Sequence, residues 1–198
     1  MQENLFTGSA VPPGFEYTPD LITHDEERAL IDAFARLEFA RVEMRGVVAR
    51  RRTAHFGWTY GYYSRRSEPG PPLPPFLVPY RDRAAKWATL HPDAFVEALV
   101  TEYPAGAPIG WHRDAPMFGD VIAGISLGAP CRMKFRPYVS PPAAARSDAP
   151  PRRTSHEREL APRSAYLITG VARREYEHSI PAVSALRYSI TFRTLRER

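Results

Sequence analysis

The sequence contains little cysteine, little lysine and no long apolar run. Its single cysteine, Cys131, excludes an intrachain disulfide and fits a reducing compartment. No stretch approaches the roughly 18 consecutive apolar residues that a membrane-spanning helix needs. Residues 1–15 lack the basic and apolar segments of a signal peptide. We therefore expect a cytoplasmic protein with no membrane partner, and nothing in the sequence indicates a protein partner.

A length of 198 residues is usual for one domain, so we expect a single domain over residues 1–198. The formal net charge is +5, and nearly all cations are arginines, since the only lysines are Lys86 and Lys134. A basic balance favours an anionic partner such as nucleic acid. The abundance of arginine, alanine and proline would also follow from a GC-rich coding sequence, so charge alone leaves this partner open.

The first half of the chain predicts helices separated by irregular segments. Thr23 and Glu26 have the spacing of a capping box, which predicts that a helix begins here. Apolar residues then recur at helical spacing over residues 30–37. A second helix is predicted over residues 80–91, where a proline ends it. Six prolines within residues 67–79 exclude a regular element there.

The pattern of the other segments is typical of strands. Residues 47–63 predict one or two strands with a turn at Gly57 or Gly61. From residue 94 onward, five apolar stretches are bounded by turn residues, and residues 137–163 between them predict a loop. Helices followed by short strands favour an α+β or mainly β fold, an antiparallel barrel or jelly roll with helices on one side. The five stretches are FVEALVTEY, GDVIAGISLG, CRMKFRP, SAYLITG and ALRYSITFRTL.

Three residues have the pattern of a metal site. His112 and Asp114 lie two positions apart, so on an extended chain their side chains point the same way. His178 follows the predicted strand SAYLITG. Two imidazoles and one carboxylate form the facial triad of non-haem Fe(II) oxygenases, which leaves open positions on the metal. A lone His-x-Asp also occurs by chance, so a second pattern is needed to support this one.

The last predicted strand supplies that second pattern. Arg187, Ser189, Thr191 and Arg193 alternate with apolar residues and therefore share one face. Such a face would ordinarily lie in solvent. With a facial triad upstream, an inward face carrying arginine matches what a 2-oxoglutarate enzyme requires, because a guanidinium binds a carboxylate through two parallel hydrogen bonds.

At this point the sequence resembles the AlkB family of 2-oxoglutarate- and Fe(II)-dependent dioxygenases over residues 94–194. The resemblance rests on the YPAG stretch that begins at Tyr103, on the triad, on the SLG that ends at Gly128, and on the terminal strand. The family's last motif is Arg-x-Asn-x-Thr-x-Arg, and here Ser189 replaces the asparagine. Its Asn-x-Tyr motif becomes Thr101-x-Tyr103.

The resemblance implies a double-stranded β-helix (jelly-roll) core over about residues 94–195, with N-terminal helices and a substrate lid over about 1–93. It implies Fe(2+), 2-oxoglutarate and O₂ as metal and cosubstrates. It implies oxidative dealkylation of N-alkylated bases in DNA or RNA, as in DNA repair. The metal and catalytic residues would be His112, Asp114 and His178, and the 2-oxoglutarate residues Arg187, Arg193, Tyr103, Ser189 and Thr101.

The residues expected to bind the substrate match the family less closely. In DNA-repair members an acidic residue that helps recognise the base follows the His-x-Asp by two positions, where this chain has Pro116; Asp120 is a substitute candidate. A segment rich in arginine and aromatic residues lies upstream, and such segments suit phosphates and unpaired bases. Each ring could equally be a core residue. The candidates in this segment are Arg52, His55, Phe56, Trp58 and Tyr60.

The sequence is therefore compatible with three functions. The first is nucleic-acid dealkylation by the iron chemistry. The second is the same chemistry on a protein side chain or a small molecule, which the unusual Pro116 and Ser189 favour. The third is a binding module that has lost catalysis, which is disfavoured because the three ligands and both arginines are present.

Overall fold

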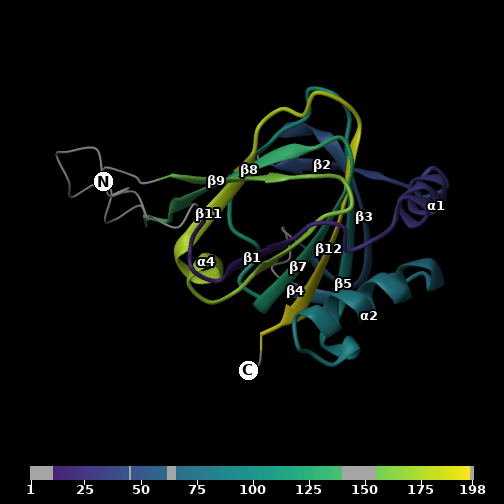
Figure 1. Ribbon diagram of the computed structural model, residues 1–198, viewed down its shortest axis with the longest axis horizontal. Coiled ribbons are helices and arrows are strands. Elements are labelled where there is room, and N and C mark those ends of the chain that lie inside the picture. Colours follow the sequence, from purple (N-terminus) through teal and green to yellow (C-terminus); the bar gives the residue numbers. More distant parts are fainter. Residues whose placement is uncertain (1–10, 45, 62–65, 140–154, 197–198) are drawn as a thin grey trace, which may run out of the picture.

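The computed structural model describes residues 11–44, 46–61, 66–139 and 155–196, and two antiparallel sheets dominate that part of the chain. The larger sheet has the strand order β1-β10-β7-β12-β5-β3-β2, with β4 paired to β3; the smaller sheet has the order β6-β11-β8-β9. Figure 1 shows α1 and α2 on one side of the strands and α4 at the opposite end. The predicted jelly roll with helices on one side is confirmed.

The helices and strands have the following bounds along the chain. The strands are β1 (Phe15–Thr18), β2 (Ala40–Met44), β3 (Val47–Gly61), β4 (Arg66–Pro69), β5 (Glu97–Tyr103), β6 (Ile109–His112), β7 (Phe118–Gly128), β8 (Cys131–Pro137), β9 (His156–Leu160), β10 (Ala165–Ile168), β11 (Tyr176–Ile180) and β12 (Arg187–Leu195). The helices are α1 (His24–Phe34), α2 (Val78–Trp87) and α4 (Gly170–Glu175), with short 3₁₀ turns at Pro75–Leu77 and Pro92–Ala94.

Helix α1 begins as its sequence predicts. The Thr23 hydroxyl accepts a hydrogen bond from the Glu26 backbone N–H, and the Glu26 carboxylate accepts one from the Thr23 N–H. Glu26 also accepts two hydrogen bonds from Arg83 of α2, at 2.7 and 3.0 Å. One carboxylate therefore caps α1 and joins it to α2.

Alternation along the central strands divides their side chains between two cores. On β12, Ile190 and Phe192 pack with Leu30 and Phe34 of α1 in a cluster on the helix-covered face of the larger sheet. The alternate residues of the same strand face the space between the two sheets. A second cluster lies there, with Phe135 at its centre and fully buried. The period of two thus directs polar side chains inward and apolar ones toward the helices.

Of the local predictions, one is narrowed and two are corrected. Residues 47–61 form one strand, in which Gly57, at φ +78°, bends the chain where its partner changes from β5 to β4. The proline-rich stretch 67–79 contains the end of β4, a 3₁₀ turn and the start of α2. The predicted loop 137–163 contains β9, which pairs with β8; residues 140–154 of that loop lie outside the described residues. Helix α4 was not predicted.

The described part of the chain contains no helix that is both long and apolar enough to cross a membrane.

Candidate metal centre and substrate cavity

A cavity of about 580 Å³ lies between the two sheets, and side chains from β3, β5, β6, β11 and β12 line it. All the residues that the sequence assigns to the metal and to 2-oxoglutarate line this cavity. They are Thr101, Tyr103, His112, Asp114, His178, Arg187, Ser189 and Arg193. The structure therefore gathers into one place residues that are up to 92 positions apart along the chain, as from Thr101 to Arg193.

The three candidate metal ligands converge because β6 and β11 are neighbours. His112 and His178 are direct partners in the antiparallel register, and their ring centroids are 4.3 Å apart. Asp114 follows β6, and its Oδ2 lies 3.8 Å from Nε2 of His178. Nδ1 of His112 is 2.8 Å from the Gly110 carbonyl oxygen. Since a carbonyl only accepts, this nitrogen carries the proton, and Nε2 keeps the lone pair that a metal requires.

Arg193 fixes the orientation of the carboxylate. Its Nε and Nη2 both donate to Oδ1 of Asp114, at 2.7 and 2.6 Å. This pairing leaves Oδ2, the oxygen that faces His178, available as a single metal-binding atom. No three His, Cys, Asp or Glu side chains of the described residues are drawn together closely enough to form a coordination site by distance alone. A bound ion would have to draw these donors closer.

The protonation states suit a divalent cation. Burial and, to a lesser extent, the adjacent His112 lower the pKa of His178 to about 3. Burial also lowers the pKa of His112. Burial raises the pKa of Asp114, but Arg193 and the two histidines outweigh that effect and hold it below its ordinary value. At neutral pH the group therefore offers two neutral imidazoles and one carboxylate, which is the donor set of non-haem Fe(II) sites.

Arg187 is a buried cation with unused hydrogen-bond donors. Its side chain is 0% exposed, its Nε donates to the Ser126 hydroxyl at 3.2 Å, and it lies 4.9 Å from the Tyr103 ring centroid. Both terminal nitrogens are buried and have no hydrogen-bond partner among the described residues. Buried donors are almost always paired in folded proteins. The two unpaired terminal nitrogens fit a carboxylate that enters the cavity.

The register of β5 and β12 places the other predicted residues around this cation. Tyr103 lies directly opposite Arg187, and Thr101 lies directly opposite Ser189. These four side chains line one wall of the cavity, at the end of β12 away from Arg193. A dicarboxylate could therefore reach from the metal ligands to Arg187 within one enclosed space.

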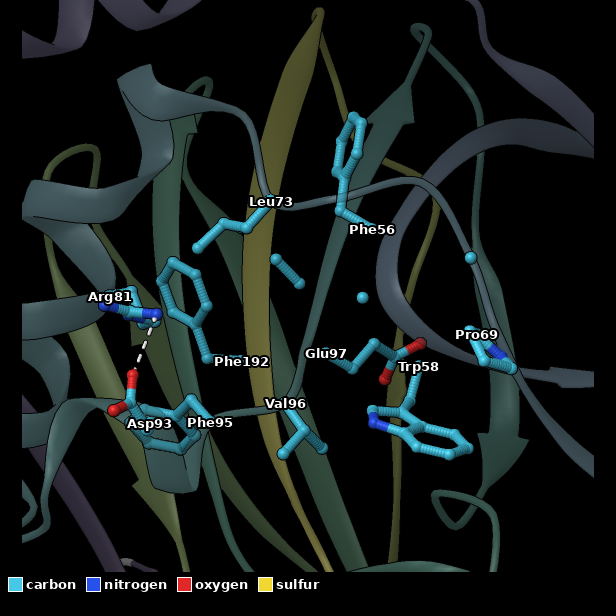
Figure 2. A pocket seen from close by; sticks show the side chains of 13 residues that line it. Phe56, Trp58, Pro69, Leu73, Arg81, Asp93, Phe95, Val96, Glu97 and Phe192 are labelled. Carbon is cyan, nitrogen blue, oxygen red and sulfur yellow. Dashed lines mark ion pairs between the residues drawn. The ribbon is translucent and has the colours of Figure 1, made fainter.

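The predicted substrate residues are only partly brought to this cavity. His55 lines it, but Arg52 points to the other face of β3, where it donates two hydrogen bonds of 2.9 Å to Glu102. Phe56 and Trp58 line a separate cavity of about 350 Å³ (Figure 2). Asp120 is exposed and pairs with Arg174, outside the site cavity. The Tyr60 side chain lies outside the described residues.

Sequence reasoning also missed residues that belong to the site. Arg51 and Glu97 line the cavity, and counting by two from His55 would have indicated Arg51 in place of Arg52. Arg173 of α4 donates to the carbonyl oxygens of Ala115 and Phe118, at 3.2 and 3.0 Å, and so holds the segment that follows Asp114. No local pattern could have indicated these contacts, because α4 lies more than 50 residues further along the chain.

Comparisons with known proteins agree with this geometry. The model of the 2OG-Fe(II) oxygenase superfamily matches residues 14–193. A protein of Arabidopsis thaliana described as an alkylated DNA repair protein ALKBH8 homolog is 33% identical over 187 residues, which cover 85% of this chain and 51% of that protein. The chain thus spans about half the length of this relative.

Two solved structures share the fold. The structure of OsALKBH1 superposes with a TM-score of 0.67 at 15% identity, over 93% of this chain and 98% of the other. A prolyl-4-hydroxylase of Pseudomonas putida superposes with a TM-score of 0.61 at 14% identity, over 93% of this chain and 94% of the other. At these identities the likeness concerns the fold alone.

Proposed function

Because the chain belongs to the 2OG-Fe(II) oxygenase superfamily, we propose that His112, Asp114 and His178 hold the ferrous ion of this family. The chain is a 2-oxoglutarate-dependent dioxygenase, and its family implies Fe(II), 2-oxoglutarate and O₂. The observation that carries the assignment is the pairing of this triad with the unsatisfied guanidinium of Arg187 in one cavity.

The side chains of this cavity have distinct tasks. Fe(II) with 2-oxoglutarate and O₂ supplies the oxidising chemistry that hydroxylates an unactivated carbon. Arg193 keeps one oxygen of Asp114 occupied, so that the carboxylate binds through the other and leaves positions open. Arg187 would take the far carboxylate of 2-oxoglutarate through its two terminal nitrogens, which have no partner among the described residues, and this contact would position the keto acid.

The substrate we propose is an N-alkylated base in DNA or RNA, which the enzyme would dealkylate oxidatively. Hydroxylation of the alkyl carbon next to nitrogen gives a product that breaks down to the free base and an aldehyde. Support comes from the printed description of the Arabidopsis relative, an alkylated DNA repair protein. Further support comes from Arg41, Arg51 and Arg113, which line the cavity and suit phosphate.

The test is coupled turnover. The purified chain would be incubated with Fe(II), 2-oxoglutarate and a panel of methylated DNA and RNA oligonucleotides, and succinate and formaldehyde would be measured together. We expect equal amounts of both products on at least one oligonucleotide, and neither product from His112→Ala. Failure to form formaldehyde on every methylated DNA and RNA would contradict the proposed substrate.

A second candidate substrate is a protein side chain or a small molecule. It is favoured by Pro116, which has no side-chain acceptor where nucleic-acid repair enzymes of the family have an acidic group. Methylated peptides belong in the same panel for that reason. Succinate formation that depends on a peptide and on no oligonucleotide would favour this candidate.

A further inference from the structure

Strand β3 directs a row of polar side chains into the candidate site. Arg51, Thr53 and His55 line the cavity, whereas the intervening Arg52 and Ala54 lie on the helix-facing side. Alternate residues of a strand are about 7 Å apart. The row therefore presents an imidazole and a cation about 13 Å apart on one surface. Both lie next to the metal ligands, so a base at His55 and a phosphate of the same strand at Arg51 can be bound together.

The imidazole of His55 is held by a buried carboxylate. Glu97 is only 2% exposed; its Oε2 accepts from Nη1 of Arg193 at 2.8 Å, and its Oε1 lies 3.2 Å from Nδ1 of His55. A carboxylate oxygen accepts, so Nδ1 of His55 carries the proton. In the neutral ring Nε2 is then an acceptor, and it has no hydrogen-bond partner among the described residues. The side chain is 35% exposed, so a ligand in the cavity can reach it.

Arg51 has the properties of an anion-binding residue. It is half-buried in the cavity wall, and it makes no ion pair or hydrogen bond within the described part of the chain. Its neighbour Arg52 differs, because Glu102 neutralises it on the opposite face. Arg51 also lies close enough to His112 that its charge adds to the effect of burial in lowering the pKa of that ligand. An anion of the substrate would offset this charge beside the metal site.

We propose that His55, positioned by Glu97, determines specificity by accepting a hydrogen bond from an N–H group of the substrate base, while Arg51 binds a phosphate of the same strand. This inference rests on the proposed function and names the base edge that the site reads. His55 supplies the acceptor that Pro116 cannot supply. The site then favours 3-methylcytosine, which keeps an amino group beside the alkylated nitrogen. It disfavours 3-methyluracil, which has a carbonyl oxygen at that position.

The experiment measures binding without turnover. Two fluorescent single-stranded oligonucleotides, identical except for one 3-methylcytosine or one 3-methyluracil, would be titrated with the metal-free protein in EDTA, and anisotropy would be recorded. An acceptor left without its donor in a closed site costs on the order of tenfold in affinity. We expect the wild-type protein to bind the 3-methylcytosine strand about tenfold more tightly, and His55→Leu to bind both strands equally.

A second variant tests the tautomer independently. In Glu97→Gln, Arg193 retains the amide oxygen because it can only donate, so the amide nitrogen faces His55. Nδ1 must then accept and Nε2 must donate. The preference should shift toward 3-methyluracil, an effect that a merely structural role of Glu97 would not produce.

Arg51 is tested against its neighbour. Arg51→Gln should reduce the slope of log affinity against log salt by about 0.7, the value for one phosphate on a single strand. Arg52→Gln should leave that slope unchanged, because its side chain faces away from the cavity. Equal slopes for the two variants would overturn the assignment of Arg51.

The outcomes separate this inference from the proposed function. Binding of both strands without preference in the wild type, or a preference that survives His55→Leu in protein with a wild-type circular dichroism spectrum, overturns the role of His55 alone. Absence of binding to either strand at low salt overturns the nucleic-acid substrate together with it. Preference for 3-methyluracil in the wild type shows that Nε2 donates, and this result also overturns the inference.

Discussion

The two arginines of β12 make opposite contributions to the stability of the ligand-free protein. Arg193 lies between Asp114 and Glu97 and donates to both, so removing it would leave two buried carboxylates uncompensated. Arg187 is more deeply buried, and its terminal nitrogens have no partner within the described residues. Its charge lowers stability until a dianion arrives. The unpaired charge therefore strengthens binding of 2-oxoglutarate but lowers the stability of the ligand-free protein.

Replacing Arg187 with methionine should stabilise the ligand-free protein and weaken its hold on 2-oxoglutarate. Removal of a buried, unpaired cation should raise the free energy of unfolding by about 1–3 kcal/mol. Loss of two charge-assisted hydrogen bonds should weaken 2-oxoglutarate binding by roughly 100-fold or more. Urea denaturation and anaerobic calorimetry with Mn(II) in place of iron would measure the two effects.

The matched control is Arg193→Met in the same strand, six positions further along. That variant should lose about 3–5 kcal/mol of stability, because it removes the cation and leaves the buried carboxylates of Asp114 and Glu97 without a counter-charge. Stability changes of the same sign in the two variants would contradict the different roles we assign to these arginines.

At the scale of elements, the bend at Gly57 allows β3 to pair first with β5 and then with β4. A Cβ built at this glycine would lie 2.1 Å from the Val96 carbonyl oxygen, and φ is +78°. We expect Gly57→Ala to cost at least about 2 kcal/mol, through backbone strain and displacement of β5. Gly46→Ala is the matched control: its φ is +77°, but apart from its chain neighbours no atom of the described residues lies within 4 Å of the added Cβ. It should cost only about 1 kcal/mol, and equal losses by denaturant unfolding would contradict this account.

The contact between α1 and α2 gives a pH-dependent contribution to stability. The hydrogen bond from Arg83 lowers the pKa of Glu26 from an ordinary 4.5 to about 2, against a smaller opposing effect of burial. A carboxylate with a lowered folded-state pKa stabilises above pH 4.5, and that contribution is lost as the pH falls toward 2. Glu26→Gln keeps a capping side chain but removes the charge. At pH 7 the free energy of unfolding of the wild type should exceed that of this variant by about 1 kcal/mol. The difference is this small because the pair of Glu26 and Arg83 is partly exposed.

Chemical denaturation at several pH values would follow this difference. It should shrink as the pH falls from 4.5 and vanish below about pH 2. A difference that stays constant across that range would mean that the Glu26 charge does not stabilise the contact between α1 and α2.

Elements with local signals were predictable, and those without them were not. Thr23 and Glu26 specify the start of α1 within four residues of sequence. The strand β9, with sequence HEREL, is exposed along most of its length and, among the described strands, pairs with β8 alone, so it lacks the apolar alternation that indicates a strand. Helix α4 has six residues and no capping side chain. Tertiary contacts, which no window of sequence contains, specify these two elements.

At the scale of the whole molecule, the site could be predicted where the alternation along one strand agrees with that of the strand beside it. The alternation from Arg187 to Arg193 indicated which side chains of β12 face inward, and the register with β5 then positions Tyr103 and Thr101 beside them. Applied to β3, the same rule separates Arg51 from Arg52 only once His55 is known to face the site, because the surrounding sequence has cations on both faces. The pairing of β3 with β5 establishes that orientation.

We expect the two hydrophobic clusters to fold the protein without the metal. Neither the cluster under α1 and α2 nor the one that contains Phe135 includes a candidate metal ligand among its members. The three ligands line the cavity and contribute donors to it, while apolar burial on both faces of the larger sheet supplies the stability. Metal and cosubstrate should therefore bind a preformed fold and stabilise it by mass action alone.

His112→Ala tests this independence of fold and metal. Without ligands its melting temperature should match that of the wild type, with a difference in stability within about 1 kcal/mol. Anaerobic addition of Fe(II) at about 100 times its dissociation constant should stabilise the wild type by about 2.7 kcal/mol and leave the variant unchanged. Scanning fluorimetry would record both shifts, and EDTA should reverse the wild-type shift. If EDTA instead unfolded the wild-type protein, the metal would be a structural component, and the division between a scaffold of two apolar cores and a site inserted between its sheets would be wrong.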